Sequence, residues 1–205
     1  MTATPEIGLF PLPVVLLPTE QVPLHVFENR YKELVAECVA EDAPFGLVYA
    51  DGDGLREVGT EAVVAEVLNR FEDGRMNIVV EGRARFRVDE LTSGRSFQTC
   101  TSSPVLDSED PADQETVERA LELFDRLREL TSSDVESPDE SPELSYALAA
   151  RVELEPEVKQ ELLEATSERE RLDRVCDLLV DAASAVERHR RAAERAATNG
   201  KVDLG

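Results

Sequence analysis

The side chains best suited to chemistry in this sequence are two histidines, three cysteines and many carboxylates. His25 and His189 lie 164 residues apart, too far to indicate a clustered metal site. Cys38, Cys100 and Cys176 are odd in number and widely spaced, so they form neither a C-x-x-C pair nor a disulfide framework. The sequence therefore predicts no metal site and no cofactor.

Catalytic signatures are missing as well. The sequence contains no phosphate-binding G-x-x-x-x-G-K-[ST] loop, no G-x-S-x-G elbow and no H-E-x-x-H motif. His25 stands between Leu24 and Val26 in an apolar run, which favours a structural, hydrogen-bonded histidine. We predict no catalytic residues and no enzymatic activity. A hydrolase with an unrecognised site, built from His25 and nearby acids, is the alternative.

Charge limits the partners that the chain can bind. The 205 residues carry 44 acidic and 22 basic side chains, a formal net charge of −22. Such a field repels phosphate backbones and anionic lipid, so nucleic-acid and membrane binding are disfavoured. The longest early apolar run, residues 14–17, is bounded by Pro13 and Pro18, which predicts neither a signal peptide nor a membrane span. We expect a cytoplasmic protein.

Short strand patterns dominate the first half of the chain. One helix interrupts them, because apolar residues recur at helical spacing between Tyr31 and Val39. The residues between the two runs 61–71 and 76–80 include Asp73 and Gly74, which predicts a hairpin. Together the patterns indicate a small, largely antiparallel barrel. The predicted strands are residues 10–17, 23–27, 45–49, 61–71, 76–80, 83–89 and 96–101.

The run from Arg83 to Asp89 alternates strictly between apolar and charged residues. This pattern predicts a half-buried strand whose other face presents three solvated arginines, at positions 83, 85 and 87. Acids at positions 81, 89 and 90 favour ion pairs for these arginines over binding of RNA or an acidic ligand.

Strand patterns stop near residue 105, and helical patterns follow. We predict helices over residues 117–130 and 144–154, a helix that Pro156 opens, and a long one that starts at Ser167. Ser167 and Glu170 match the S-x-x-E capping box of that last helix. The predicted organisation is a barrel with one helix over residues 1–105 and a helical part over residues 106–205.

Several short motifs resemble the substrate-binding N-terminal domain of Lon proteases. They include L-F-P-L at residues 9–12, P-L-H-V-F-E-N-R-Y at residues 23–31 and D-G-R-M-N-I at residues 73–78. The family opens similarly and reads P-L-x-I-F-E-x-R-Y in the second stretch. The match spans residues 7–105, and residues 159–172 are similar to the helical half that follows. One departure is Thr19, where the family usually has Gly, so we expect that turn to differ.

The resemblance implies an α+β protein with a PUA-like barrel, mostly antiparallel, followed by a C-terminal helical bundle. It also implies capture of unfolded or flexible polypeptides, with delivery to a separate ATP-dependent protease or chaperone as an extension. The sequence itself contains no ATPase or Ser-Lys peptidase motif, so it resembles a stand-alone substrate-binding module. The candidate contact residues are Leu24, Phe27, Tyr31 and Phe45, which could equally be core.

Two questions stay open at this point. The motif at residues 23–31 is either structural or ligand-facing; within it Glu28 and Arg30 are two apart, so we expect each to pair elsewhere. The alternative function is a PUA-like nucleic-acid or nucleotide-binding protein, which would require a basic patch that the charge of −22 argues against.

Overall fold

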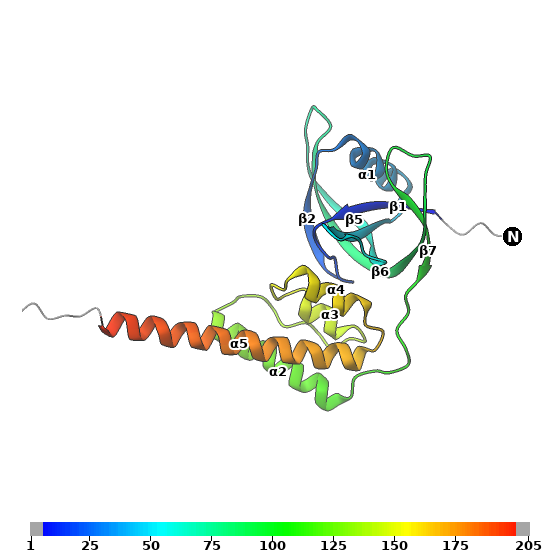
Figure 1. The fold of residues 1–205 in the computed structure, drawn as a ribbon. Helices are drawn as coiled ribbons and strands as arrows, with labels where there is room; N and C mark the ends of the chain where they lie inside the picture. The colour runs from blue at the N-terminus through cyan, green and yellow to red at the C-terminus, as the bar shows by residue number, and fades with distance from the viewer. Residues whose placement is uncertain (1–5, 200–205) are drawn as a thin grey trace, which may run out of the picture. The chain divides into compact units, whose positions relative to one another are not determined.

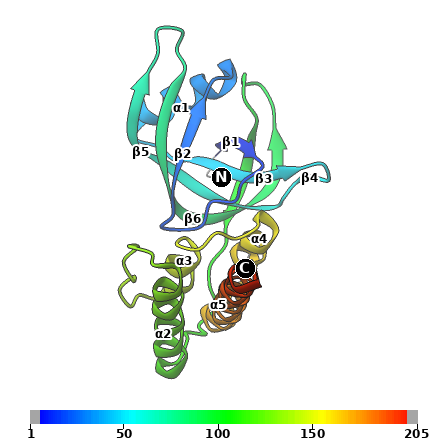
Figure 2. The same cartoon turned by 90° about the vertical axis from the view of Figure 1, so that its left-hand side faces the viewer.

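The computed structural model describes residues 6–199 and divides into two compact units (Figures 1 and 2). The first unit contains the chain up to Ser108 together with residues 152–166. The second contains residues 109–151 and the chain from Ser167 onward. The chain thus leaves the first unit, returns to it and leaves it again.

A seven-stranded sheet closes on itself in the first unit. Its strand order is β1-β7-β6-β5-β3, and β3 pairs back to β1 in parallel, while the other pairings are antiparallel. This closure confirms the α+β class and the mostly antiparallel barrel. The strands are β1 (Glu6–Leu12), β2 (Gln21–Val26), β3 (Phe45–Asp51), β4 (Gly54–Leu55), β5 (Val58–Arg70), β6 (Met76–Thr92) and β7 (Thr99–Pro104).

The strand boundaries correct the sequence predictions in three places. The predicted strand over 10–17 lies at Glu6–Leu12 instead, before Pro13. The two predicted strands over 76–80 and 83–89 are one continuous strand, β6. The last predicted strand, 96–101, begins later, at Thr99.

The long strand β6 supports an extension of the barrel. Its first half pairs with β2 on one side and with the second half of β5 on the other. Val26 pairs with Met76, and Met76 also pairs with Arg70, so three strands end together beside the turn that joins β5 to β6. We call these strand ends and the β5–β6 turn the three-stranded tip.

Helix α1 (Asn29–Glu41) covers the main core of the barrel. Its buried residues Tyr31, Leu34, Val35 and Cys38 follow the predicted helical spacing, which is confirmed. They pack with inward residues of the strands, among them Phe10, Phe45, Leu47 and Ile78.

The turn at Thr19 keeps a conformation that favours glycine. Thr19 has a φ of 67°, in the left-handed region where a side chain is strained. Its backbone N–H donates to the carbonyl of Gly82 at 2.9 Å. A β-branched residue therefore occupies a left-handed position in this turn.

Helix α4 (Pro156–Glu164) belongs to the barrel unit, although we predicted that everything after residue 105 forms one helical part. The Tyr49 hydroxyl donates to a Glu157 carboxylate at 2.9 Å, and Gln160 donates to the Val58 carbonyl at 3.1 Å. These polar contacts join residues about a hundred positions apart, so no local pattern announced them.

Arg85 also corrects a prediction. Its side chain is buried, not solvated, and it donates to the carbonyls of Leu163 and Ala165 at 2.7 and 2.6 Å and pairs with Asp107. The end of α4 and the segment after β7 cover this part of β6 and supply acceptors for the guanidinium. The neighbouring arginines at positions 83 and 87 are exposed. Arg83 pairs with Glu81, as predicted, whereas Arg87 pairs with Glu57 and not with the acids at positions 89 and 90.

The second unit is helical. It contains α2 (Gln114–Thr131), α3 (Leu144–Ala149) and α5 (Glu168–Asn199). The backbone N–H of Glu170 donates to Ser167 Oγ at 3.1 Å, which confirms the Ser167 cap. The helix predicted over 144–154 ends at Ala149, and the residues from Val152 onward belong to the barrel unit.

We expect Leu179→Ala to destabilise the helical unit strongly. Leu179 is fully buried on α5, in the stripe that packs against α2. Truncating a buried leucine removes apolar burial and leaves a cavity, which together cost about 2–5 kcal/mol. Thermal unfolding followed by circular dichroism measures the change, and a melting temperature equal to that of the wild type would show that the stripe is not core.

A search of the described helices for membrane spans gave none with the necessary length and apolar character.

Candidate functional site

The structure separates the four predicted contact residues by burial. Phe45 and Tyr31 lie in the barrel core, where the Phe10 ring stacks on Tyr31 with centroids 4.0 Å apart and tilts against Phe45 at 5.9 Å. Leu24 is half-buried and packs against the same core. Phe27 is 59% exposed. The motif at residues 23–31 thus contains core residues and one solvent-facing aromatic side chain.

Glu28 and Arg30 pair with each other, contrary to the prediction. Arg30 donates to a Glu28 carboxylate oxygen at 2.8 Å, and its guanidinium lies 4.5 Å from the centre of the Tyr31 ring. Helical spacing does not apply, because Glu28 precedes α1 and has an extended backbone, with φ −73° and ψ 137°. This contact fixes the entry of the chain into α1.

An exposed aromatic cluster forms at the three-stranded tip. The His25 ring stacks on Phe27 with centroids 5.9 Å apart and meets the edge of Phe71 at 6.3 Å. The Arg75 guanidinium lies 5.4 Å from the centre of the Phe71 ring. Phe71 is 43% exposed. We call His25, Phe27, Phe71 and Arg75 the aromatic tip cluster.

Strand pairing and a tight turn hold this cluster in place. His25 lies opposite Asn77 in the β2–β6 register, and His25 Nδ1 is 2.6 Å from the Asn77 side-chain oxygen. In the turn, Phe71 N–H donates to the Arg75 carbonyl at 2.9 Å, while Gly74 has a φ of 81° that favours glycine. The cluster is therefore built on regular backbone, although its side chains are open to solvent.

Asp73 also orients the Arg75 side chain within the turn. The Asp73 carboxylate accepts a hydrogen bond from the backbone N–H of Arg75 at 3.1 Å and pairs with the Arg75 guanidinium at 2.6 Å. Both interactions hold the pKa of Asp73 below its usual range, and the backbone hydrogen bond is the larger cause. Asp73 thus stays ionised and orients Arg75 over Phe71.

Sequence reasoning missed Phe71 and assigned His25 a purely structural role. The predicted hydrogen bond of His25 exists, but its ring is exposed and belongs to the aromatic tip cluster. A signal for Phe71 was present, since a large aromatic residue directly precedes the polar turn of the predicted hairpin. Its partners at positions 25 and 27 were identifiable only from the pairing of β2 with β6.

The cysteines provide no nucleophile. All three are buried, and burial raises the pKa of Cys38 and of Cys100 to about 11 and raises that of Cys176. These thiols are protonated near neutral pH, and a thiol attacks only as the thiolate. Across residues 6–199, no three His, Cys, Asp or Glu side chains gather as a metal site would require.

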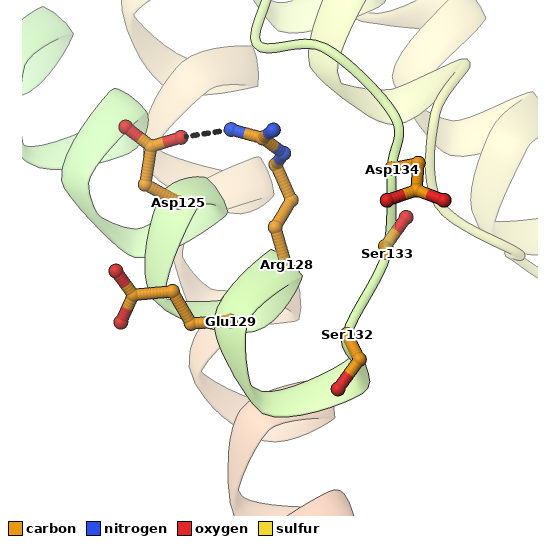
Figure 3. A pocket seen from close by; sticks show the side chains of 6 residues that line it. All are labelled: Asp125, Arg128, Glu129, Ser132, Ser133 and Asp134. Atoms are coloured by element: carbon orange, nitrogen blue, oxygen red, sulfur yellow. Dashed lines mark hydrogen bonds and ion pairs between the residues drawn. The ribbon is translucent and has the colours of Figure 1, made fainter.

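A cavity of about 550 Å³ lies in the helical unit, at the end of α2 (Figure 3). The Asp125 carboxylate accepts a hydrogen bond from Arg128 at 2.8 Å and another from the Ser137 hydroxyl. These two bonds hold the pKa of Asp125 below its ordinary value. The remaining lining is polar or acidic, with Glu129 and residues 132–134. The carboxylate is ionised and already satisfied, and no histidine or thiol lines the cavity.

Comparisons with known proteins agree on one family. The model of the ATP-dependent protease La (LON) substrate-binding domain matches residues 6–181. A Lon protease of Paraburkholderia phytofirmans is 28% identical over 98% of this chain, and Lon protease 2 of Myxococcus xanthus is 28% identical over 80%. The chain covers 27% and 22% of these two proteins, so it spans about a quarter of their length.

Solved structures show the same fold. The Lon N-terminal domain protein from Xanthomonas campestris superposes with a TM-score of 0.65 at 25% identity, covering 83% of this chain and 96% of that one. The N-terminal domain of the Mycobacterium avium complex Lon protease gives 0.66 at 20% identity, covering 88% and 98%. With the family model spanning most of its length, this chain belongs to the LON substrate-binding domain family.

Proposed function

We propose that this chain is a non-catalytic module that binds polypeptide segments through the aromatic tip cluster. Family membership supports the polypeptide ligand. The observation that carries the placement is the exposure of two phenylalanines that both contact His25 at the tip, since proteins rarely leave aromatic side chains grouped in water without a partner.

The chemistry of the cluster suits an unfolded client. Unfolded chains expose apolar and aromatic side chains, and these stack on phenylalanine rings in preferred offset or edge-on geometries. Tyr31 and Phe45 support the site from the core and do not contact the ligand. Of the four sequence candidates, Phe27 is the contact residue, and Leu24 packs against the barrel core.

The net charge adds a second preference. A field of −22 raises the local concentration of cations and speeds encounters with basic segments. Added salt screens that contribution over a Debye length of about 8–10 Å and leaves apolar contacts nearly unchanged. Peptides that combine aromatic and basic residues therefore bind best, and their salt dependence follows their positive charge.

We expect Phe27→Ala/Phe71→Ala to weaken binding of unfolded polypeptide on the order of tenfold or more, because anchoring aromatic residues dominate binding energies. Fluorescence anisotropy with labelled, unfolded casein measures the dissociation constant. The matched control is Leu91→Ala, which removes another exposed apolar side chain of the barrel unit, 52% exposed, and leaves binding unchanged. Equal affinity of the double variant and the wild type would exclude the aromatic tip cluster as the site.

The module itself turns over neither ATP nor polypeptide, and delivery to a separate ATP-dependent protease or chaperone completes the proposed role. Purified protein incubated with ATP and casein tests the first part. Turnover that a point substitution in this chain abolishes would contradict it. Tight binding of an RNA oligomer with no binding of apolar or basic peptides would favour the nucleic-acid alternative.

A further inference from the structure

One face of α5 is exposed along nearly its whole length. The opposite face packs against α2 and α3 through buried residues such as Leu172, Val175 and Leu179. Along one row of this surface, exposed residues and the half-buried Ser184 recur every three or four positions, which keeps them within an arc of about 80° on the helix. We call them the charged stripe: Asp173, Asp177, Val180, Ser184, Arg188 and Arg191. Figure 1 shows α5 continuing beyond the end of α2.

Charge is segregated along this stripe. Its N-terminal half carries aspartates at positions 173 and 177, and its C-terminal half carries arginines at positions 188 and 191. Exposed Arg195 continues the basic half by one more turn. Val180, 41% exposed, and Ser184 separate the two halves.

The helix itself does not explain this segregation. The helix dipole favours acids at the N-terminus and bases at the C-terminus, but only within the first and last turn. Asp177 lies in the third turn of a 32-residue helix and Arg188 lies about three turns before its end. Like charges four apart, such as Asp173 and Asp177, destabilise a helix. One basic side chain of the stripe is partly offset within the helix, since Arg191 pairs with Glu187 at 3.4 Å.

The stripe is symmetric about Ser184. The spacings between successive positions from 173 to 195 are 4, 3, 4, 4, 3 and 4, the same in both directions. A two-fold rotation about an axis at Ser184 exchanges position 173 with 195 and position 177 with 191. Each aspartate then occupies the place of an arginine.

We propose that the charged stripe is an interface with a second copy of this chain, in which two α5 helices pair antiparallel about a two-fold axis at Ser184. Asp177 of each copy then faces Arg191 of the other, and Asp173 faces Arg195. Val180 of each copy lies opposite Arg188 of the other, where it contacts the aliphatic part of that side chain. A two-fold interface requires such self-complementarity, because the same patch serves both copies.

Charge complementarity favours a second copy over other occupants. A nucleic acid or an anionic vesicle would meet the arginines but also the aspartates, which repel phosphate. A basic partner would be attracted to one half and repelled by the other. Only a surface with the reverse order of charges satisfies both halves, and the stripe is itself that surface when turned around.

Two charge reversals test the arrangement with the full chain. In an Asp177→Arg dimer, the introduced arginine of each copy faces Arg191 of the other, so the contact is repulsive at both symmetric positions. In an Arg191→Asp dimer, the introduced aspartate of each copy faces Asp177 of the other, which is again repulsive at both positions. We expect each variant alone to raise the dimer dissociation constant on the order of tenfold, because each reversal replaces two attractions by two repulsions. The double variant restores the opposite charges and recovers the wild-type constant. An equimolar mixture of the single variants also recovers it by forming heterodimers.

Sedimentation velocity over a range of protein concentrations, at about 0.1 M salt, measures these constants. At that ionic strength the repulsion between distant charges of the two copies is screened beyond about 10 Å, while contacting pairs are screened less. The control is Glu122→Arg, an exposed residue of α2, which brings the net charge to −20 as Asp177→Arg does. It leaves dimerisation unchanged or strengthens it slightly.

The proposal is overturned if the wild-type chain stays monomeric up to about millimolar concentration. It is also overturned if the mixture of single variants associates no better than each alone. Loss of association in Glu122→Arg equal to that in Asp177→Arg would show a non-specific charge effect and would equally contradict the stripe. Circular dichroism verifies that each variant is folded.

Discussion

Glu168→Ala is expected to lower the free energy of unfolding by about 3–5 kcal/mol, because it removes a carboxylate that pairs with a buried guanidinium. The Arg171 side chain is fully buried, and its guanidinium pairs with Glu168 at 2.6 Å. The same carboxylate accepts hydrogen bonds from the Ser145 backbone N–H at 2.9 Å and hydroxyl at 2.7 Å. Removing it deprives α3 and α5 of a common acceptor.

Other buried groups belong to the same network. Arg171 Nε donates to Ser145 Oγ at 2.8 Å, and the guanidinium lies 4.1 Å from the centre of the Tyr146 ring. Water cannot easily replace the carboxylate, since Ser145 and Tyr146 are buried too.

Urea unfolding followed by circular dichroism measures the effect. The control is Asp181→Ala, which removes an exposed carboxylate from the middle of the same helix and changes the free energy by no more than about 0.5 kcal/mol. A loss below about 1 kcal/mol in Glu168→Ala would mean that the Arg171 charge is solvated or paired well enough without Glu168.

Phe45→Ala is expected to cost about 3–5 kcal/mol of stability, because it opens a cavity in the barrel core. Phe45 is 0% exposed and packs against Phe10. Phe27→Ala also replaces a phenylalanine, but it is expected to change stability by less than about 1 kcal/mol, because the Phe27 ring is already mostly exposed to solvent.

The two substitutions separate folding from binding. Phe45→Ala lowers the midpoint of urea unfolding, and polypeptide binding persists in whatever fraction remains folded. Phe27→Ala keeps the midpoint and weakens binding. A Phe45→Ala protein that is as stable as the wild type but no longer binds casein would contradict this assignment. Phe45 would then be a contact residue and not a core residue.

The sequence alone could not separate contact residues from core residues among the four candidates, Leu24, Phe27, Tyr31 and Phe45. All four are apolar residues near the ends of strands or the start of a helix, so their types alone do not separate core from surface. Burial of Tyr31 and Phe45 depends on Phe10, which is contributed by a different strand. Phe71 joins the cluster only because β2 and β5 both pair with β6.

The sequence by itself determined the local elements and the family. Helical and alternating spacings identified α1, α2, α5 and most strands, because backbone conformation and amphipathic patterning act over a few residues. The net charge is also readable directly. These properties depend on neighbours in the chain, which a sequence displays.

Only the tertiary structure decided where α4 belongs, which arginine is buried and which aromatic residues meet. Arg85 is buried by acceptors at 163 and 165, and His25 meets a ring at 71. These contacts join residues from about 45 to 80 positions apart, and their partners are set by strand register and helix docking. Local periodicity does not predict such long-range contacts. It indicates that a side chain is buried, but it does not indicate which segment covers that side chain.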